Sequence, residues 1–138
     1  MNRRSALALS LSVALPLVAA RPARADTAAA PPPGSSLIGS WTVDLRPTPA
    51  SPAYLKKLLI TRVEGTRIEG SFYDGSPLQA GRINSTSTPQ LCFAFLTDPG
   101  EGAYATSGRQ IAPDRLEGMT LSTTRGFVLP WTATRDPG

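Results

Sequence analysis

The first clear pattern along the chain is an alternation of apolar or small residues with polar ones over positions 37–45, which only Ile38 interrupts. Trp41 and Val43 stand among apolar or small residues at the odd positions, and Thr42 and Asp44 stand among polar residues at the even ones. A period of two is typical of a β-strand that buries one face. We therefore predict that residues 37–45 form the first strand of a β domain.

Turn signals built from Gly, Pro, Asn and Asp recur every eight to fourteen residues after this strand and divide the rest of the chain into short segments. These residues favour turns because they tolerate a positive φ or preset a negative one. The pattern predicts eight strand segments, at 37–45, 54–63, 66–73, 78–85, 90–97, 102–110, 115–123 and 127–134.

Three of these segments carry features of their own. Segment 54–63 also fits a helical face, but the residues around Glu64 and Gly65 favour two strands joined by a tight turn. Segment 115–123 changes phase between Gly118 and Met119, as a β-bulge would require. Segment 90–97 is apolar on both faces, so its outer face has the character of a contact surface for a partner chain or for the N-terminal spacer.

Eight short strands with short connections predict an all-β fold, a small eight-stranded antiparallel up-and-down β-barrel of the lipocalin or avidin kind. Closing the sheet removes its exposed edges, and an eight-stranded barrel is filled by side chains or holds one small ligand. A β-sandwich is the alternative that the same pattern allows.

The N-terminal region has the features of a secretory signal peptide. A basic start at Arg3 and Arg4 is followed by an apolar run and by the small-residue site that ends at Ala25. The run is shorter than a membrane span and contains Pro16, so we expect no membrane anchor. We predict a signal peptide at 1–25, a Pro- and Ala-rich spacer at 26–36 and a β-barrel domain at 37–135. Export would be to the periplasm or the extracellular space of a bacterium, by the Sec or the Tat route.

Charge argues against nucleic acid as a partner. The chain has 14 Lys and Arg, of which four lie in the predicted leader, and the remaining ten equal the ten Asp and Glu. Nucleic-acid binding needs a basic face, and the Lys56–Lys57 doublet is better explained as solvated surface. The single Cys92 allows no intrachain disulfide, and its apolar neighbours predict a buried, inert thiol.

The chain contains no histidine, which removes Ser-His-Asp and Cys-His catalysis and every His-containing metal site. Asp44 with either Glu69 or Glu117 could form a glycosidase-like pair of carboxylates, but each of these residues lies on the polar phase of its strand. We therefore expect no enzyme, no catalytic residues, no metal and no cofactor.

Several short motifs resemble the strand signatures of avidin and streptavidin, in the same order. They are Gly39-Ser40-Trp41, Gly70-Ser71-Phe72, Thr106-Ser107-Gly108-Arg109 and Trp131-Thr132-Ala133-Thr134. The resemblance implies an eight-stranded barrel with a ligand cavity at one mouth.

The biotin-binding side chains of that family do not carry over to this chain. Val43, Pro47 and Phe72 stand where the family has polar groups, and Thr120 and Leu121 lie where it has a tryptophan. An unpaired buried urea group costs about 1–3 kcal/mol for each lost partner. Biotin is therefore excluded as the expected ligand.

A second resemblance is to bacterial periplasmic inhibitors of metalloproteases, which are also small barrels. Residues 35–41, Ser-Ser-Leu-Ile-Gly-Ser-Trp, are similar to the start of those proteins. The resemblance implies an N-terminal arm that enters the protease cleft. Those inhibitors carry a disulfide, which this chain cannot form.

Two functional hypotheses follow from these observations. In the first, the barrel binds a small apolar ligand in a cavity lined by some of five aromatic residues, Trp41, Phe72, Phe93, Phe95 and Trp131. In the second, the chain contacts a protein partner, such as a protease, through residues 26–36. Homo-oligomer formation is open in both, and the five aromatics could equally fill a closed core.

Overall fold

The computed structural model describes residue 14 and residues 30–138, and its compact unit spans Pro31–Gly138. The predicted signal peptide at 1–25, residue 14 aside, and the first four residues of the predicted spacer lie outside the described residues. The unit contains a short 3₁₀-helix, η1 (Ser35–Leu37), and nine β-strands. The strands are β1 (Gly39–Asp44), β2 (Leu55–Glu64), β3 (Arg67–Phe72), β4 (Ser76–Pro77), β5 (Gln79–Asn84), β6 (Cys92–Thr97), β7 (Tyr104–Ala112), β8 (Arg115–Ser122) and β9 (Phe127–Arg135).

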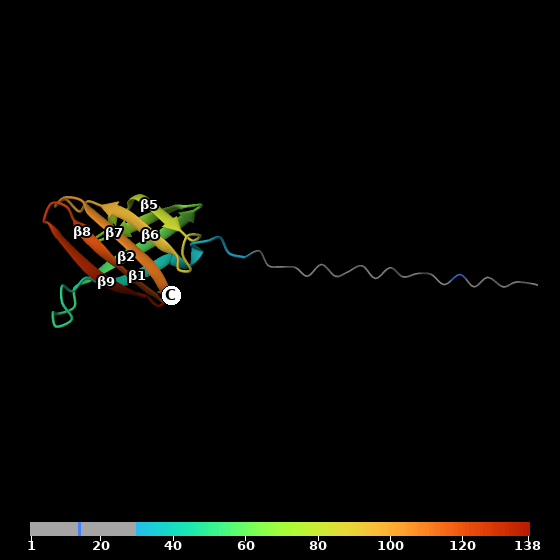
Figure 1. Ribbon diagram of the computed structural model, residues 1–138, viewed down its shortest axis with the longest axis horizontal. Helices are drawn as coiled ribbons and strands as arrows, with labels where there is room; N and C mark the ends of the chain where they lie inside the picture. The colour runs from blue at the N-terminus through green and yellow to red at the C-terminus, as the bar shows by residue number, and fades with distance from the viewer. Residues whose placement is uncertain (1–13, 15–29) are drawn as a thin grey trace, which may run out of the picture. The chain divides into compact units, whose positions relative to one another are not determined.

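Eight of these strands form a closed antiparallel barrel, which confirms the predicted fold class. Neighbouring strands pair in the order β2-β1-β9-β8-β7-β6-β5-β3, and the pairing of β2 with β3 closes the ring (Figure 1). Each of the eight predicted segments corresponds to one of these strands, including segment 54–63, and no strand extends more than two residues beyond its segment. The two-residue β4, which pairs only with β3, is an addition that the sequence pattern did not predict.

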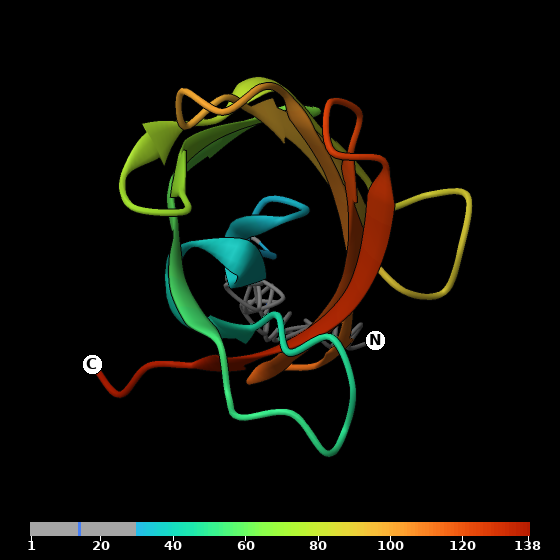
Figure 2. The same ribbon diagram turned by 90° about the vertical axis from the view of Figure 1, so that its left-hand side faces the viewer.

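The up-and-down order places alternate strand connections at opposite ends of the barrel. Residues 45–54, 73–78, 98–103 and 123–126 connect strands at one end, which we call the mouth. Figure 2 looks into this end, with the β1–β2 connection at its rim and η1 at the far end of the barrel. We call the end with η1 the closed end.

The N-terminal helix closes its end of the barrel by burying Leu37 and Gly34. Gly34 has φ +85°, and a Cβ there would meet Ile83 Cδ1 at 2.4 Å, so only glycine fits. Trp41 Nε1 donates a hydrogen bond of 2.9 Å to Leu37 O, and Trp41 is 0% exposed. The Ser-Ser-Leu segment of the inhibitor resemblance is thus η1, and its leucine is part of the core.

The predicted bulge in segment 115–123 was wrong. Strand β8 keeps continuous register with β9 from Arg115 to Ser122, and the β7–β8 irregularity lies at Gln110 and Ala112 instead. Leu116 and Thr120 point inward, so Met119 falls on the outer face, where it is 54% exposed. The change of phase in the sequence came from apolar residues on the outside of the barrel.

Candidate functional site

The inward-facing residues of β6–β9 are stacked in rows from the mouth to the closed end. The register puts Thr97, Tyr104, Ser122 and Phe127 in the row nearest the mouth. The next row holds Phe95, Thr106, Thr120 and Leu129, and the third holds Phe93, Gly108, Gly118 and Trp131. Hydroxyl groups therefore concentrate in the half of this wall that is nearest the mouth.

The five aromatic residues predicted to line a cavity lie in the hydrophobic core, each no more than 4% exposed. Phe72, Phe93, Phe95 and Trp131 form a chain of contacts, with ring centroids 5.7 Å apart for Phe72–Phe95, 6.2 Å for Phe93–Phe95 and 6.3 Å for Phe93–Trp131. Gly108 and Gly118 make room for two of these rings, since a Cβ on Gly108 would lie 2.6 Å from Phe93 Cζ and 2.7 Å from Trp131 Cη2. None of the five is among the side chains that line the cavity at the mouth.

A cavity of about 540 Å³ opens at the mouth, between the β1–β2 connection and the ends of β7–β9. We call it the mouth cavity. This volume is within the usual range for small-molecule sites. Most of its lining is aromatic or aliphatic, with contributions from Leu45, Pro52, Tyr54, Tyr73, Tyr104 and Phe127.

All three tyrosines of the chain meet at this cavity. The ring centroids of Tyr73 and Tyr104 are 5.7 Å apart in a stacked arrangement, and those of Tyr104 and Phe127 are 6.3 Å apart. The hydroxyls of Tyr54 and Tyr73 are hydrogen-bonded at 2.5 Å. Burial and this hydrogen bond raise the pKa of Tyr73, so its hydroxyl stays neutral over the physiological range.

The turn that carries Tyr73 holds an uncommon backbone conformation. Tyr73 and the following Asp74 have φ values of 55° and 58°, and Gly75 continues in the same region at 87°. Left-handed non-glycine residues are strained by about 1–3 kcal/mol each and cluster at ligand sites. Lys56 holds this turn through bonds of 3.0 and 2.9 Å to the two carboxylate oxygens of Asp74.

Three buried polar side-chain atoms find no hydrogen-bond partner among the described residues: Thr97 Oγ1, Tyr104 Oη and Trp131 Nε1. All three belong to the β6–β9 wall and face the barrel interior. An unsatisfied buried polar group costs about 1–3 kcal/mol. Such groups are expected where a ligand or a water completes the bonding. By contrast, Thr106 and Thr120 satisfy one another at 3.0 Å.

Arg125 is the one charged residue that lines the mouth cavity, as far as the structure describes the chain. Its guanidinium lies 5.4 Å from the centre of the Phe127 ring. The neighbouring Tyr104 hydroxyl raises the pKa of Arg125, although the two groups are not in hydrogen-bond geometry. The nearest carboxylate, that of Glu101, is 3.8 Å away, and both side chains of this pair are more than half exposed.

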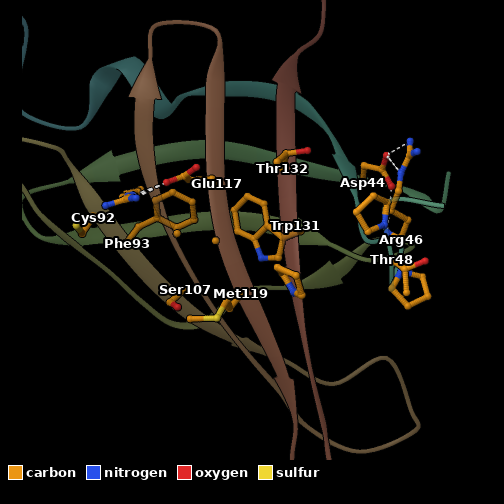
Figure 3. A pocket seen from close by; sticks show the side chains of 16 residues that line it. Asp44, Arg46, Thr48, Cys92, Phe93, Ser107, Glu117, Met119, Trp131 and Thr132 are labelled. Atoms are coloured by element: carbon orange, nitrogen blue, oxygen red, sulfur yellow. Dashed lines mark hydrogen bonds and ion pairs between the residues drawn. The ribbon is translucent and has the colours of Figure 1, made fainter. Parts of the chain in front are cut away.

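A second hollow, the outer groove, lies along the outside of β7–β9 beside the β1–β2 connection and measures about 910 Å³. Two of the five aromatic residues predicted to line a cavity, Phe93 and Trp131, line this groove, together with Gly108 and Gly118. Figure 3 shows its side chains, with Arg109 bonded to Glu117 and Arg46 bonded to Asp44. The bonds from Arg46 lower the pKa of Asp44. The charges of this groove are therefore already paired with one another, unlike the Arg125 charge at the mouth.

The three carboxylates that the sequence offered as candidate catalytic pairs lie in two different locations. Asp44 and Glu117 belong to the outer groove, each paired with an arginine, whereas Glu69 lies exposed on β3. Cys92, expected to be buried, is partly exposed on the outer phase of β6 and lines the same groove.

Within the described ranges, no three His, Cys, Asp or Glu residues gather as metal ligands, and no helix there has the length and hydropathy needed to cross a membrane.

A band without charged residues covers the part of the outer face of β6–β9 that is nearer the mouth. Two adjacent cross-strand rows make it up. The first row is Leu96, Ala105, Leu121 and Val128, and the second is Ala94, Ser107, Met119 and Pro130. Leu121 is 45% exposed. The apolar outer face predicted for segment 90–97 is one edge of this band.

Sequence reasoning did not find the mouth residues. Tyr54, Tyr73, Tyr104 and Phe127 lie at or next to the ends of strands, where alternation gives no information about burial. The available signal was topological: in an up-and-down barrel, the end of one strand and the start of the next lie at the same end of the molecule.

Comparison of the chain with family models, with curated proteins and with solved structures finds no match in any of the three. The likeness to avidin and to the metalloprotease inhibitors rests on short sequence motifs. The feature that both resemblances imply, a closed eight-stranded antiparallel barrel, is present.

Proposed function

We propose that this chain is an exported, non-enzymatic binding protein that holds one small, largely apolar molecule in the mouth cavity. The observation that carries the proposal is the lining of that cavity: stacked tyrosines, Phe127 and aliphatic side chains around about 540 Å³. Burying a flat apolar body against such surfaces contributes about 25 cal/mol for each Å² removed from water.

Two further features support the mouth over the rest of the barrel. The closed end is filled by Leu37 and Trp41, and the middle is filled by the aromatic core. The mouth also has the strained turn at Tyr73 and Asp74, a conformation that tends to persist where it positions a ligand. The expected ligand is not biotin, because the buried positions Val43 and Phe72 offer it no hydrogen bonds.

The alternative proposal, a protein-interaction module such as a protease inhibitor, places function in residues 26–36. Of the described part of that segment, Ser35 and Ser36 belong to η1, and Arg135 donates a hydrogen bond to Ser36 O. An arm that enters a protease cleft would have to begin before η1. The mouth cavity is the better supported of the two sites because its residues are described and its geometry is that of a ligand pocket.

The test is native mass spectrometry of the chain purified, without refolding, from the cells that produce it. We expect a bound small molecule, which is released on denaturation. Two neighbouring variants locate it: Leu129→Trp fills the mouth cavity from the inner face of β9, whereas Val128→Trp adds the same bulk to the outer face. The proposal predicts loss of the molecule from Leu129→Trp alone. Equal retention in both variants would place the molecule elsewhere and contradict it.

A further inference from the structure

Two side chains that line the mouth cavity, those of Arg125 and Tyr104, have polar groups that form no side-chain hydrogen bond in the described part of the chain. The Arg125 guanidinium can only donate hydrogen bonds, and the Tyr104 hydroxyl can donate as well as accept. The hydroxyl of Thr97, beside the cavity, is also without a partner. Tyr104 and Thr97 are cross-strand neighbours, 4% and 1% exposed. A ligand that satisfies this wall must bring acceptors.

The distribution of charge at the mouth also favours a ligand that brings hydrogen-bond acceptors. Three cations lie at the mouth, Arg46, Lys56 and Arg125. Arg46 is bonded to Asp44, and Lys56 is held by both oxygens of Asp74. Arg125 has only the exposed Glu101 at 3.8 Å, and no carboxylate lines the mouth cavity in the described part of the chain. A surface pair of this kind contributes little, so the guanidinium is available for an anion.

From these observations we infer that the ligand of the mouth cavity is a small organic anion, a carboxylate on a flat apolar body. Its carboxylate binds Arg125 and accepts a hydrogen bond from the Tyr104 hydroxyl, and its body lies among the tyrosine rings. This inference rests on the proposed binding function and adds the chemical class of the ligand. An ionised carboxylate fits because it has only acceptors, and charge-assisted bonds to arginine are among the strongest in proteins.

The arrangement also gives an order of events. The Tyr104 hydroxyl is enclosed, while the Arg125 side chain lies on the β8–β9 turn and is 56% exposed. An incoming carboxylate therefore meets the guanidinium first. The inference then requires the Arg125 side chain to move with the anion, so that the enclosed Tyr104 hydroxyl becomes accessible.

The experiment compares two probes of one shape by isothermal titration calorimetry at pH 7: 2-naphthoate, which is an anion, and 2-naphthamide, which is neutral. We expect the native chain to bind both and to bind the acid about tenfold more tightly, as one charge-assisted contact provides. Added salt should weaken binding of the acid and leave the amide unchanged.

Single substitutions test which residues cause the preference for the acid over the amide. Arg125→Gln should bring the two affinities within about twofold of one another, and Tyr104→Phe should lower the affinity for the acid about threefold or more. Arg67→Gln, an exposed arginine at the start of β3 near the closed end, is the matched control and should change neither affinity.

The outcomes separate this inference from the proposed function. Binding of both probes with equal affinity, or an acid preference that survives in Arg125→Gln, would overturn the anion inference and leave the mouth as a site for apolar molecules. Failure of both probes to bind at millimolar concentration would overturn the inference and the proposed function together.

Discussion

The two ends of the barrel differ in how completely their charged side chains are hydrogen-bonded. At the closed end the Arg135 guanidinium lies 4.1 Å from the centre of the Trp41 ring and donates to Ile38 O at 2.9 Å and to Pro113 O. At the mouth the Arg125 guanidinium lies over Phe127, but it donates to no carbonyl group in the described chain. An arginine is thus hydrogen-bonded to the backbone at the closed end, whereas Arg125 at the mouth has no such bond to the residues that the structure describes.

One aspartate at each end, Asp136 at the closed end and Asp74 at the mouth, shows the same difference. Asp136 accepts hydrogen bonds from Ser40, Thr42 and Lys57, whereas Asp74 at the mouth meets only Lys56. The Asp136 side chain is 21% exposed and that of Asp74 is 70% exposed, so hydrogen bonds from the protein matter more to Asp136, while water solvates Asp74. This difference is what we expect if the closed end stabilises the fold and the mouth has the binding role that we propose for it.

The largest expected effect on stability comes from replacing each of the two arginines by methionine in a separate variant. Arg135→Met removes the cation–π contact with Trp41 and leaves the carbonyls of Ser36 and Ile38 without their donor, so we expect the free energy of unfolding to fall by about 2–3 kcal/mol. Arg125→Met should change it by less than about 0.5 kcal/mol. Urea denaturation followed by tryptophan fluorescence measures both, and equal losses would remove the distinction between the ends.

A smaller effect is expected from the aspartates and depends on pH. Hydrogen bonds from Lys57, Ser40 and Thr42 lower the pKa of Asp136 to about 2, from an ordinary value of 3.8. The stabilisation is therefore complete above about pH 4 and is lost as the pH falls through 2, with a size of about 1–2 kcal/mol.

Asp136→Asn should accordingly be less stable than the native chain at pH 7, and the difference in the free energy of unfolding should shrink steadily from pH 4 to pH 2. Asp74→Asn, whose partner Lys56 sits at the mouth, should differ little at either pH because exposed pairs contribute about 0–1 kcal/mol. Thermal unfolding at several pH values provides the readout. A constant gap between native chain and Asp136→Asn down to pH 2 would show that the carboxylate does not carry the effect.

The smallest expected effect concerns the unpartnered hydroxyls. Thr97→Val removes a buried hydroxyl that has no partner in the described chain, so the free energy of unfolding should rise by about 0.5–1 kcal/mol. Thr106→Val, in the next row, breaks a 3.0 Å bond and leaves Thr120 unpaired, so it should lower stability by about 1 kcal/mol or more. Chemical denaturation of both variants decides whether the two hydroxyls differ in sign.

Much of the barrel could be predicted from the sequence because alternation reports which face of a strand is buried. Trp41 and Val43 on one phase, with Thr42 and Asp44 on the other, were sufficient to define β1 and its inner face. The prediction failed at Met119, because β8 carries apolar residues on its outer face and the alternation there no longer marks the inside.

The site was less accessible to sequence reasoning than the fold. Large apolar aromatics such as Phe93 and Trp131 pack the core, as most aromatic side chains in small domains do. The mouth depends on Tyr54, Tyr73 and Tyr104, which come from three distant parts of the chain and meet only in the complete ring. The ring is completed by the pairing of the first strand, β1, with the last, β9, and a local pattern cannot report such a long-range contact.

The most direct test of the account is to map the binding of 2-naphthoate by ¹⁵N–¹H correlation spectroscopy of the chain without its predicted leader. The account predicts that the largest shifts occur at the mouth, at the amides of Tyr104, Thr120 and Phe127, while Trp41 and Arg135 stay unchanged. Largest shifts at the closed end, or along Glu117 and Thr132 in the outer groove, would show that the mouth is not the site that takes a ligand.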